Sequence, residues 1–225
     1  MTGMRRAFAT VLLVVAGAMV ISIAWAWRQS RQTPEWWAPV NPAAPEVEVA
    51  GEQFETRIVN ETRRVRPESE TWRIRIDENA VNAWLAARFP KWAESQFDGE
   101  SIINRLSETH VRIEEEGVIR LGARYGERDE GQPLSIAMRL MMTEDGRVVG
   151  EIEDAAAGRL PLPATMVLDE ILPRLDDALA AAILDAEPID PVIPLGGGDD
   201  RTIRIVSLDF EPGALTLRAK TESDG

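Results

Sequence analysis

The sequence predicts an α+β domain behind a membrane anchor, and three observations carry this prediction. The chain opens on a long uncharged stretch, continues with paired segments of alternating apolar and polar residues, and contains segments with helical spacing. Its 225 residues are 44% hydrophobic, which is enough for one domain with a substantial core. We therefore expect a single domain in which a long amphipathic helix packs on a curved antiparallel sheet.

The anchor prediction rests on residues 7–27, which contain no charged side chain. A helix needs about 20 apolar residues to cross a bilayer, and this run has that length. Arginines flank the run, and two tryptophans lie where an interfacial aromatic belt is expected: Arg5, Arg6, Arg28, Arg31, Trp25 and Trp27. The sequence thus predicts a cytoplasmic N-terminus at residues 1–6 and a single-pass signal anchor at residues 7–27.

The alternative is a cleaved signal peptide, because Ala24 and Ala26 resemble a cleavage site. The apolar run, however, exceeds the 7 to 15 residues or so of a typical signal-peptide core. The length of the uncharged run therefore favours an anchor that is retained over a signal peptide that is cleaved. Under both interpretations the remaining chain lies outside the cytoplasm.

The charge distribution excludes one class of partner. The net charge is −13, and all 38 Asp and Glu residues follow Arg31. Such a surface repels phosphate backbones, so nucleic-acid binding is not expected, and broad contact with anionic headgroups is disfavoured. The absence of cysteine from the sequence excludes disulfides, thiolate metal sites and cysteine nucleophiles.

Residues 28–46 are rich in proline and polar residues and predict a linker, so the domain is expected to span residues 47–225. Trp36 and Trp37 interrupt this linker. We interpret them as aromatics that dock on the membrane interface or on the domain, in preference to a ligand site. Apolar residues at helical spacing then predict a helix over residues 47–65.

Residues 72–89 change from strand to helix periodicity. Trp72 to Ile76 alternate as in a half-buried strand, Asp77 offers a side-chain oxygen for the helix N-cap, and Pro90 is expected to end the helix. On the apolar face of this helix, Asn82 is expected to satisfy nearby backbone groups and Arg88 to reach a carboxylate or the last-turn carbonyls.

Period-two segments around turn residues predict hairpins in the rest of the chain. The turns are expected at Glu115–Gly117, at Asp145-Gly146 and at Glu211–Gly213. The strand before the second turn places its apolar residues on one face. The extended segment "RLPLP" then leads into a long amphipathic helix predicted over residues 165–185, with a leucine-rich side.

Motifs for catalysis or metal binding are not found in the sequence. His110 falls on the polar side of its strand, which favours a solvated residue over a catalytic base. The stretch "GGGDD" lacks the Lys and Ser or Thr of a phosphate-binding loop, and the acidic pairs lack a calcium-loop pattern. We therefore predict no catalytic, cofactor-binding or metal-ligating residues and a protein that is not an enzyme.

The order of elements carries a resemblance. The stretches Ile76 to Phe89 and Gly158 to Pro163, behind an N-terminal anchor, resemble the YpmS-like family of single-pass bacterial membrane proteins. More remotely the chain looks like the tubular lipid-binding superfamily. The resemblance to this superfamily implies a long helix wrapped by a curved antiparallel sheet, with acyl chains between them. It supplies no catalytic residues.

A helix on a curved sheet also encloses an apolar wedge, and flexible methionines suit ligands of varying shape, although methionines line dry cores more often. The first hypothesis is therefore a domain that binds a lipid or other apolar ligand; the second is a scaffold or assembly module that binds another envelope protein. The candidate ligand contacts are Trp84, Leu85, Ile136, Met138, Leu140, Met142, Leu168, Leu172, Leu175 and Leu179.

Overall fold

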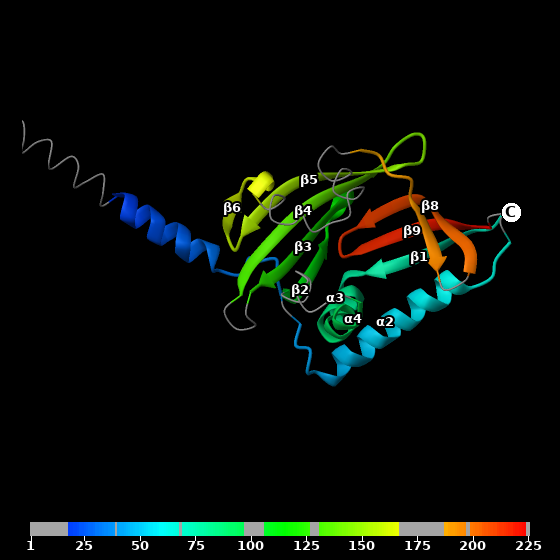
Figure 1. Cartoon of the computed structure of the whole chain (residues 1–225), viewed down its shortest axis with the longest axis horizontal. Helices are drawn as coiled ribbons and strands as arrows, with labels where there is room; N and C mark the ends of the chain where they lie inside the picture. The colour runs from blue at the N-terminus through cyan, green and yellow to red at the C-terminus, as the bar shows by residue number, and fades with distance from the viewer. Residues whose placement is uncertain are drawn as a thin grey trace, which may run out of the picture.

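The computed structural model describes residues 18–38, 40–67, 69–96, 106–126, 131–166, 187–196 and 199–223. These residues form an α+β arrangement with antiparallel strands, as the sequence predicts, but the strands are divided between two sheets where one was expected (Figure 1). The helices are α2 (Pro45–Arg63), α3 (Glu78–Ala87) and α4 (Phe89–Gln96). The strands are β1 (Thr71–Asp77), β2 (Leu106–Ile113), β3 (Val118–Tyr125), β4 (Gln132–Met142), β5 (Val148–Ala157), β6 (Leu160–Leu162), β7 (Val192–Gly196), β8 (Asp199–Glu211) and β9 (Ala214–Ser223).

The four-stranded sheet has the order β1-β9-β8-β7, and the five-stranded sheet has the order β2-β3-β4-β5-β6. Their apolar faces meet at one side in a buried cluster of Val111, Ile113 and Leu215, which we call the seam. On the other side, Val148 of β5 pairs with Ile189 just before β7 through two backbone hydrogen bonds of 2.9 Å. The two sheets thus face one another and are joined at both sides.

The three predicted hairpin turns are confirmed. A short 3-10 turn at Glu115–Gly117 joins β2 to β3, and the turns before Val148 and Ala214 join the β4–β5 and β8–β9 pairs. Gly117 has a φ of +87°, and a Cβ there would overlap the carbonyl oxygen of Leu140. Glycine suits this turn because it adopts that backbone region and leaves room for the neighbouring strand.

The switch from strand to helix at residues 71–87 is also confirmed, but its ends differ from the prediction. Asp77 occupies the N-cap position without a side-chain capping bond, and its carboxylate instead accepts a hydrogen bond from Arg75 Nε at 3.0 Å. The helix ends at Ala87, and Pro90 lies in the first turn of α4, where its missing N–H costs nothing.

Residues 18–30 form a helix that projects from the domain (Figure 1). Its large hydrophobic side chains are 58 to 71% exposed: Met19, Val20, Ile21, Ile23, Trp25 and Trp27. Within the described part of the chain, no helix has both the length and the hydropathy needed to cross a membrane. The first part of the predicted anchor, residues 7–17, lies outside the described residues.

The predicted linker contacts the domain closely. Trp37 is 4% exposed, and the rings of Trp36 and Trp37 stack at 5.8 Å against the five-stranded sheet beside Gly122. A Cβ on Gly122 would lie 2.9 Å from Trp36 and 3.1 Å from Trp37. The two tryptophans therefore dock on the domain, one of the two roles predicted for them.

The predicted long helix over residues 165–185 falls almost entirely outside the described residues. Ala164 to Met166 are helical. Its candidate contacts, Leu168, Leu172, Leu175 and Leu179, are outside the described part of the chain.

Candidate functional site

Four of the predicted ligand contacts lie on one face of β4. Ile136, Met138, Leu140 and Met142 are alternate residues of this strand, and side chains two residues apart in a strand point to the same side. The strand register places residues of the two adjacent strands on the same face. They are Ile119 and Leu121 of β3, and Val148, Gly150, Ile152, Ala155 and Ala157 of β5. We call this apolar surface the inner face of the five-stranded sheet.

Met138 lies over Gly150. Its sulfur is 3.1 Å from where a Cβ of Gly150 would be, so the absent side chain leaves room for the thioether. The ladder shifts here by one residue, so that Met138 pairs with Ile152 and Ala137 pairs with Asp154. The extra residue, Glu153, forms an ion pair with Arg139. This bulge keeps the charged groups of β5 away from the inner face.

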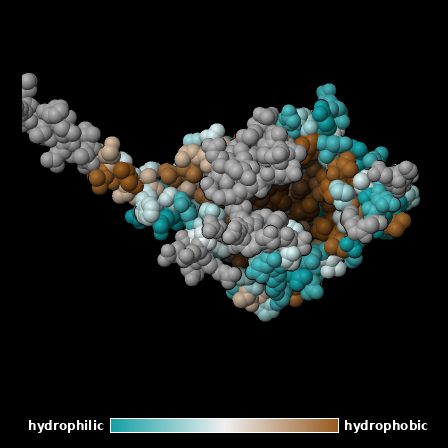
Figure 2. Space-filling model, in the orientation of Figure 1, coloured by the Kyte–Doolittle hydropathy of each residue, from teal (hydrophilic) through white to brown (hydrophobic). Residues whose placement is uncertain are grey.

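Burial on β4 is the reverse of what its sequence suggests. The more polar or smaller residues Pro133, Ser135 and Ala137 are buried, with Ser135 and Ala137 only 7% and 1% exposed. The apolar inner residues from Leu134 to Met142 are half-buried, and Leu121 beside Ile136 is 40% exposed. Figure 2 shows hydrophobic residues gathered in a hollow between the five-stranded sheet and β8 and β9. The apolar area over β3 and β4 is thus partly exposed, although Ala155 and Ala157 of the same face are only 1% and 3% exposed. Exposed apolar area of this kind is a usual mark of a contact site.

The other two described candidates lie elsewhere. Leu85 packs against the buried seam and belongs to the contact between α3 and the sheets. Trp84 forms an aromatic cluster with Phe89 and Trp92, at ring distances of 5.8 and 6.3 Å, and its indole N–H donates to Glu55. Helical spacing identified the apolar side of α3 but not which neighbour each residue meets.

Two polar side chains of α3 hold β2 beside the seam. Asn82 is buried, donates to the carbonyl of Val111 at 2.8 Å and accepts from the N–H of Val111 at 2.7 Å. Glu78 accepts the N–H of Ile113 at 2.7 Å. Because both groups satisfy an edge strand as a neighbouring strand would, the predicted backbone role of Asn82 is confirmed.

Arg88 takes the first of its two predicted roles, contact with a carboxylate, because its guanidinium pairs with Glu55 of α2 at 2.9 Å. The hydrogen bond from Arg88 lowers the pKa of Glu55, and burial opposes this effect. The Glu55 carboxylate therefore joins α2 to α3 through Arg88 and Trp84.

The outer face of the same sheet carries a polar cleft of about 860 Å³. We call it the acidic cleft, because it is lined by Glu35, Glu78, Glu114, Glu115, Glu116 and Glu153 against the two guanidinium groups of Arg112 and Arg139. Trp36 covers one side, and Gly213 of the β8–β9 turn lines another. Several carboxylates already have partners, as in the Arg120–Glu114 and Arg139–Glu153 pairs.

His110 lines this cleft, and its predicted solvent exposure is wrong. The side chain is on the polar side of β2 as expected, yet it is only 6% exposed because the ring of Trp36 lies 5.9 Å away. Its Nδ1 has no hydrogen-bond partner among the described residues. Burial lowers the pKa of His110; Glu78 opposes this effect and Arg112 adds to it, so the surroundings favour the neutral imidazole.

Among the described residues, no group of three or more His, Asp and Glu side chains is placed to hold a metal ion. The chain matched no protein-family model, no curated protein and no solved structure.

Proposed function

We propose that this protein is a membrane-anchored, extracytoplasmic domain of the bacterial envelope that binds a lipid or another apolar ligand without catalysing a reaction. The observation that carries the proposal is the reversed burial of β4, where the apolar face is less covered than the face with smaller and more polar residues. Leaving such area in water costs about 25 cal/mol per Å². An apolar ligand on the inner face would remove that cost.

The shape of the inner face suits an acyl chain. From Leu134 to Met142 the strand advances eight steps of about 3.3 Å, or about 26 Å in all. Met138 and Met142 are flexible and polarisable, so they adapt to chains of different length and unsaturation. The resemblance to tubular lipid-binding proteins, which implies acyl chains beside a curved antiparallel sheet, supports the same proposal.

The membrane anchor belongs to the same proposal. The described half of the uncharged run is a helix whose large hydrophobic side chains are mostly exposed. Such a helix is stable in lipid and costly in water. Residues 7–27 then form the span, with the domain on the extracytoplasmic side.

Photolabelling of the reconstituted full chain tests ligand binding. The protein is placed in phospholipid vesicles that contain a lipid with a photoreactive group on its acyl chain, irradiated and digested, and the adducts are mapped by mass spectrometry. We expect adducts on β3 to β5 as well as on residues 7–27. Adducts confined to residues 7–27 would overturn lipid binding by the domain.

A second candidate function is a scaffold that binds another envelope protein, and the acidic cleft favours it. Its lining has more carboxylates than guanidiniums, which suits a basic segment of a partner. A photocrosslinking amino acid at Glu115, in intact cells, should then capture a defined protein. The same amino acid at Glu52 on α2 is the control, and equal capture at both positions would count against a docking role for the cleft.

A further inference from the structure

The turn before β6 is fixed against the end of the N-terminal helix. The N–H of Arg159 donates to the carbonyl of Gln29 at 2.9 Å, and its guanidinium pairs with Glu35 at 3.3 Å. Gly158, at a φ of +59°, lies so close to Ser30 that a Cβ would overlap the Ser30 backbone. Because backbone packs directly against backbone in this contact, β6 and the end of the N-terminal helix are fixed relative to one another.

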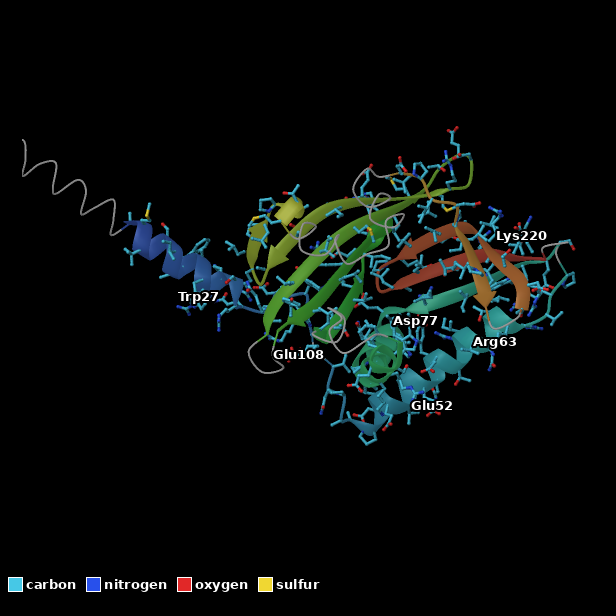
Figure 3. All side chains as sticks on the ribbon, viewed as in Figure 1. Trp27, Glu52, Arg63, Asp77, Glu108 and Lys220 are labelled. Carbon is cyan, nitrogen blue, oxygen red and sulfur yellow. The ribbon has the colours of Figure 1, made fainter. Side chains whose placement is uncertain are left out.

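This contact determines where β6 lies relative to a bilayer. Gln29 follows Trp27, the last residue of the uncharged run, by two residues, which span at most about 7 Å even when extended. Trp27 lies at the end of the helix beside the β6 end of the sheet (Figure 3). If residues 7–27 cross the membrane, β6 must lie at the membrane surface.

The composition of β6 suits that surface. From Leu160 to Met166 the sequence "LPLPATM" contains no charge, in a chain with a net charge of −13. Pro161, Pro163 and Met166 are exposed, Met166 by 61%. The acidic surface disfavours broad contact with anionic headgroups, whereas a short uncharged segment can enter the interfacial region without that repulsion.

The register connects this segment to the inner face. Leu162 pairs with Ala155, which pairs with Ile136; Leu160 pairs with Ala157, which pairs with Leu134. Paired residues of adjacent antiparallel strands point to the same side of a sheet. One uncharged apolar surface therefore extends from the edge strand β6, across β5, to β4 and its methionines.

We propose that β6 rests on the bilayer and that Leu160 and Leu162 form the portal through which an acyl chain passes between the outer leaflet of the anchoring membrane and the inner face. This inference rests on the proposed lipid-binding function and adds where the lipid comes from and by which edge it enters. The lipid source is the bilayer itself, because the portal faces it.

The first test measures membrane contact. Because the sequence contains no cysteine, Met166→Cys and Glu144→Cys each give one labelling site, the first beside β6 and the second in the β4–β5 turn at the other end of the sheet. A fluorophore on each full-length variant in vesicles is quenched with spin-labelled phospholipid. We expect strong quenching at Met166→Cys and little at Glu144→Cys. Equal quenching at the two sites would overturn the membrane contact.

The second test measures how fast an acyl chain passes the portal from the bilayer to the inner face. Leu162→Glu puts a carboxylate on the apolar path, and Met141→Glu puts one on the outer face of β4, away from β6. We expect uptake of a fluorescent-acyl phospholipid from vesicles to slow about tenfold in Leu162→Glu, because a charge on an apolar path raises its barrier, and to change about twofold or less in Met141→Glu. Equal rates in the two variants would overturn the portal.

The outcomes separate the two proposals. Acyl photoadducts on β3 to β5 with no quenching at Met166→Cys would refute the portal and leave lipid binding intact. Absence of those adducts in the wild-type protein would refute lipid binding, and the portal with it. Adducts, quenching at Met166→Cys and slowed uptake in Leu162→Glu together would support both.

Discussion

The seam and the open stretch of the inner face are built from similar apolar residues but differ in burial. The open stretch consists of Leu121 of β3 and Ile136, Met138, Leu140 and Met142 of β4. At the seam, Val111, Ile113 and Leu215 are 8, 4 and 7% exposed, because side chains of both sheets and α3 meet there. In the open stretch, Leu121 is 40% exposed, and Ile136, Met138, Leu140 and Met142 are half-buried. Both follow the same alternation of apolar and polar residues. Alternation therefore identifies the inward side of a strand, and the distance to the opposing elements decides whether that side becomes core.

The largest predicted effect tests the seam. Ile113→Ala should lower the free energy of unfolding by about 2 to 5 kcal/mol, because it removes buried methyl groups from a closed cluster. Ile136→Ala in the open stretch is the matched control and should cost about 1 kcal/mol or less, since a half-buried side chain loses less on truncation. Urea unfolding of both variants, without added lipid, gives the comparison. Equal losses would show that the open stretch is ordinary core.

The second prediction concerns the polar support of the seam. Asn82→Ala leaves both the N–H and the C=O of Val111 without their side-chain partner, at a cost of about 1 to 3 kcal/mol. Hydrogen exchange at the Val111 amide should accelerate by more than the global loss of stability explains. Exchange that follows global stability alone would contradict a local role for Asn82.

The third prediction probes the open stretch directly. In a close-packed core Met138→Trp would cost about 1 to 3 kcal/mol by overpacking, but on the uncovered inner face it should cost less than about 1 kcal/mol. The larger ring should also remove acyl photoadducts from β4. Met141→Trp is the control, because Met141 is on the same strand, faces the other way and is 38% exposed. Strong destabilisation by Met138→Trp, with photolabelling unchanged, would contradict an open ligand surface.

The smallest effect should come from His110 on the outer face. Because burial lowers its pKa, the unfolded chain binds more protons than the folded protein as pH falls through the ordinary histidine value of about 6.5. The contribution of His110 is therefore present above that pH and is lost toward the lower pKa of the folded state. The melting temperature of wild type should fall more than that of His110→Gln between pH 7 and 5. If the melting temperatures of wild type and His110→Gln fell equally with pH, His110 would make no contribution of this kind.

Local patterns of the sequence predicted the parts of the fold that local chemistry determines. The hairpin turns, the β1-to-α3 switch and the backbone role of Asn82 follow from turn residues, periodicity and side-chain hydrogen bonding. Asp77 takes the predicted N-cap position but not the predicted capping bond, and its carboxylate pairs with Arg75 instead. The exposure of His110 was wrong because Trp36, distant in sequence, covers it. The inner face needed strand register, which apolar patterns alone do not give.

The single pairing between Val148 and Ile189 has a mechanical consequence. It joins β5 to the residues before β7 by two backbone hydrogen bonds, whereas at the seam a packed hydrophobic cluster accompanies the hydrogen bond from the N–H of Gly213 to the carbonyl of Ile113. Exposed backbone hydrogen bonds open locally at far lower cost than a buried cluster. The seam therefore acts as a hinge between the two sheets, and the pairing of Val148 with Ile189 closes the opposite side. Opening of this pairing would widen the space between the sheets for a bulkier ligand, while the seam keeps the sheets together.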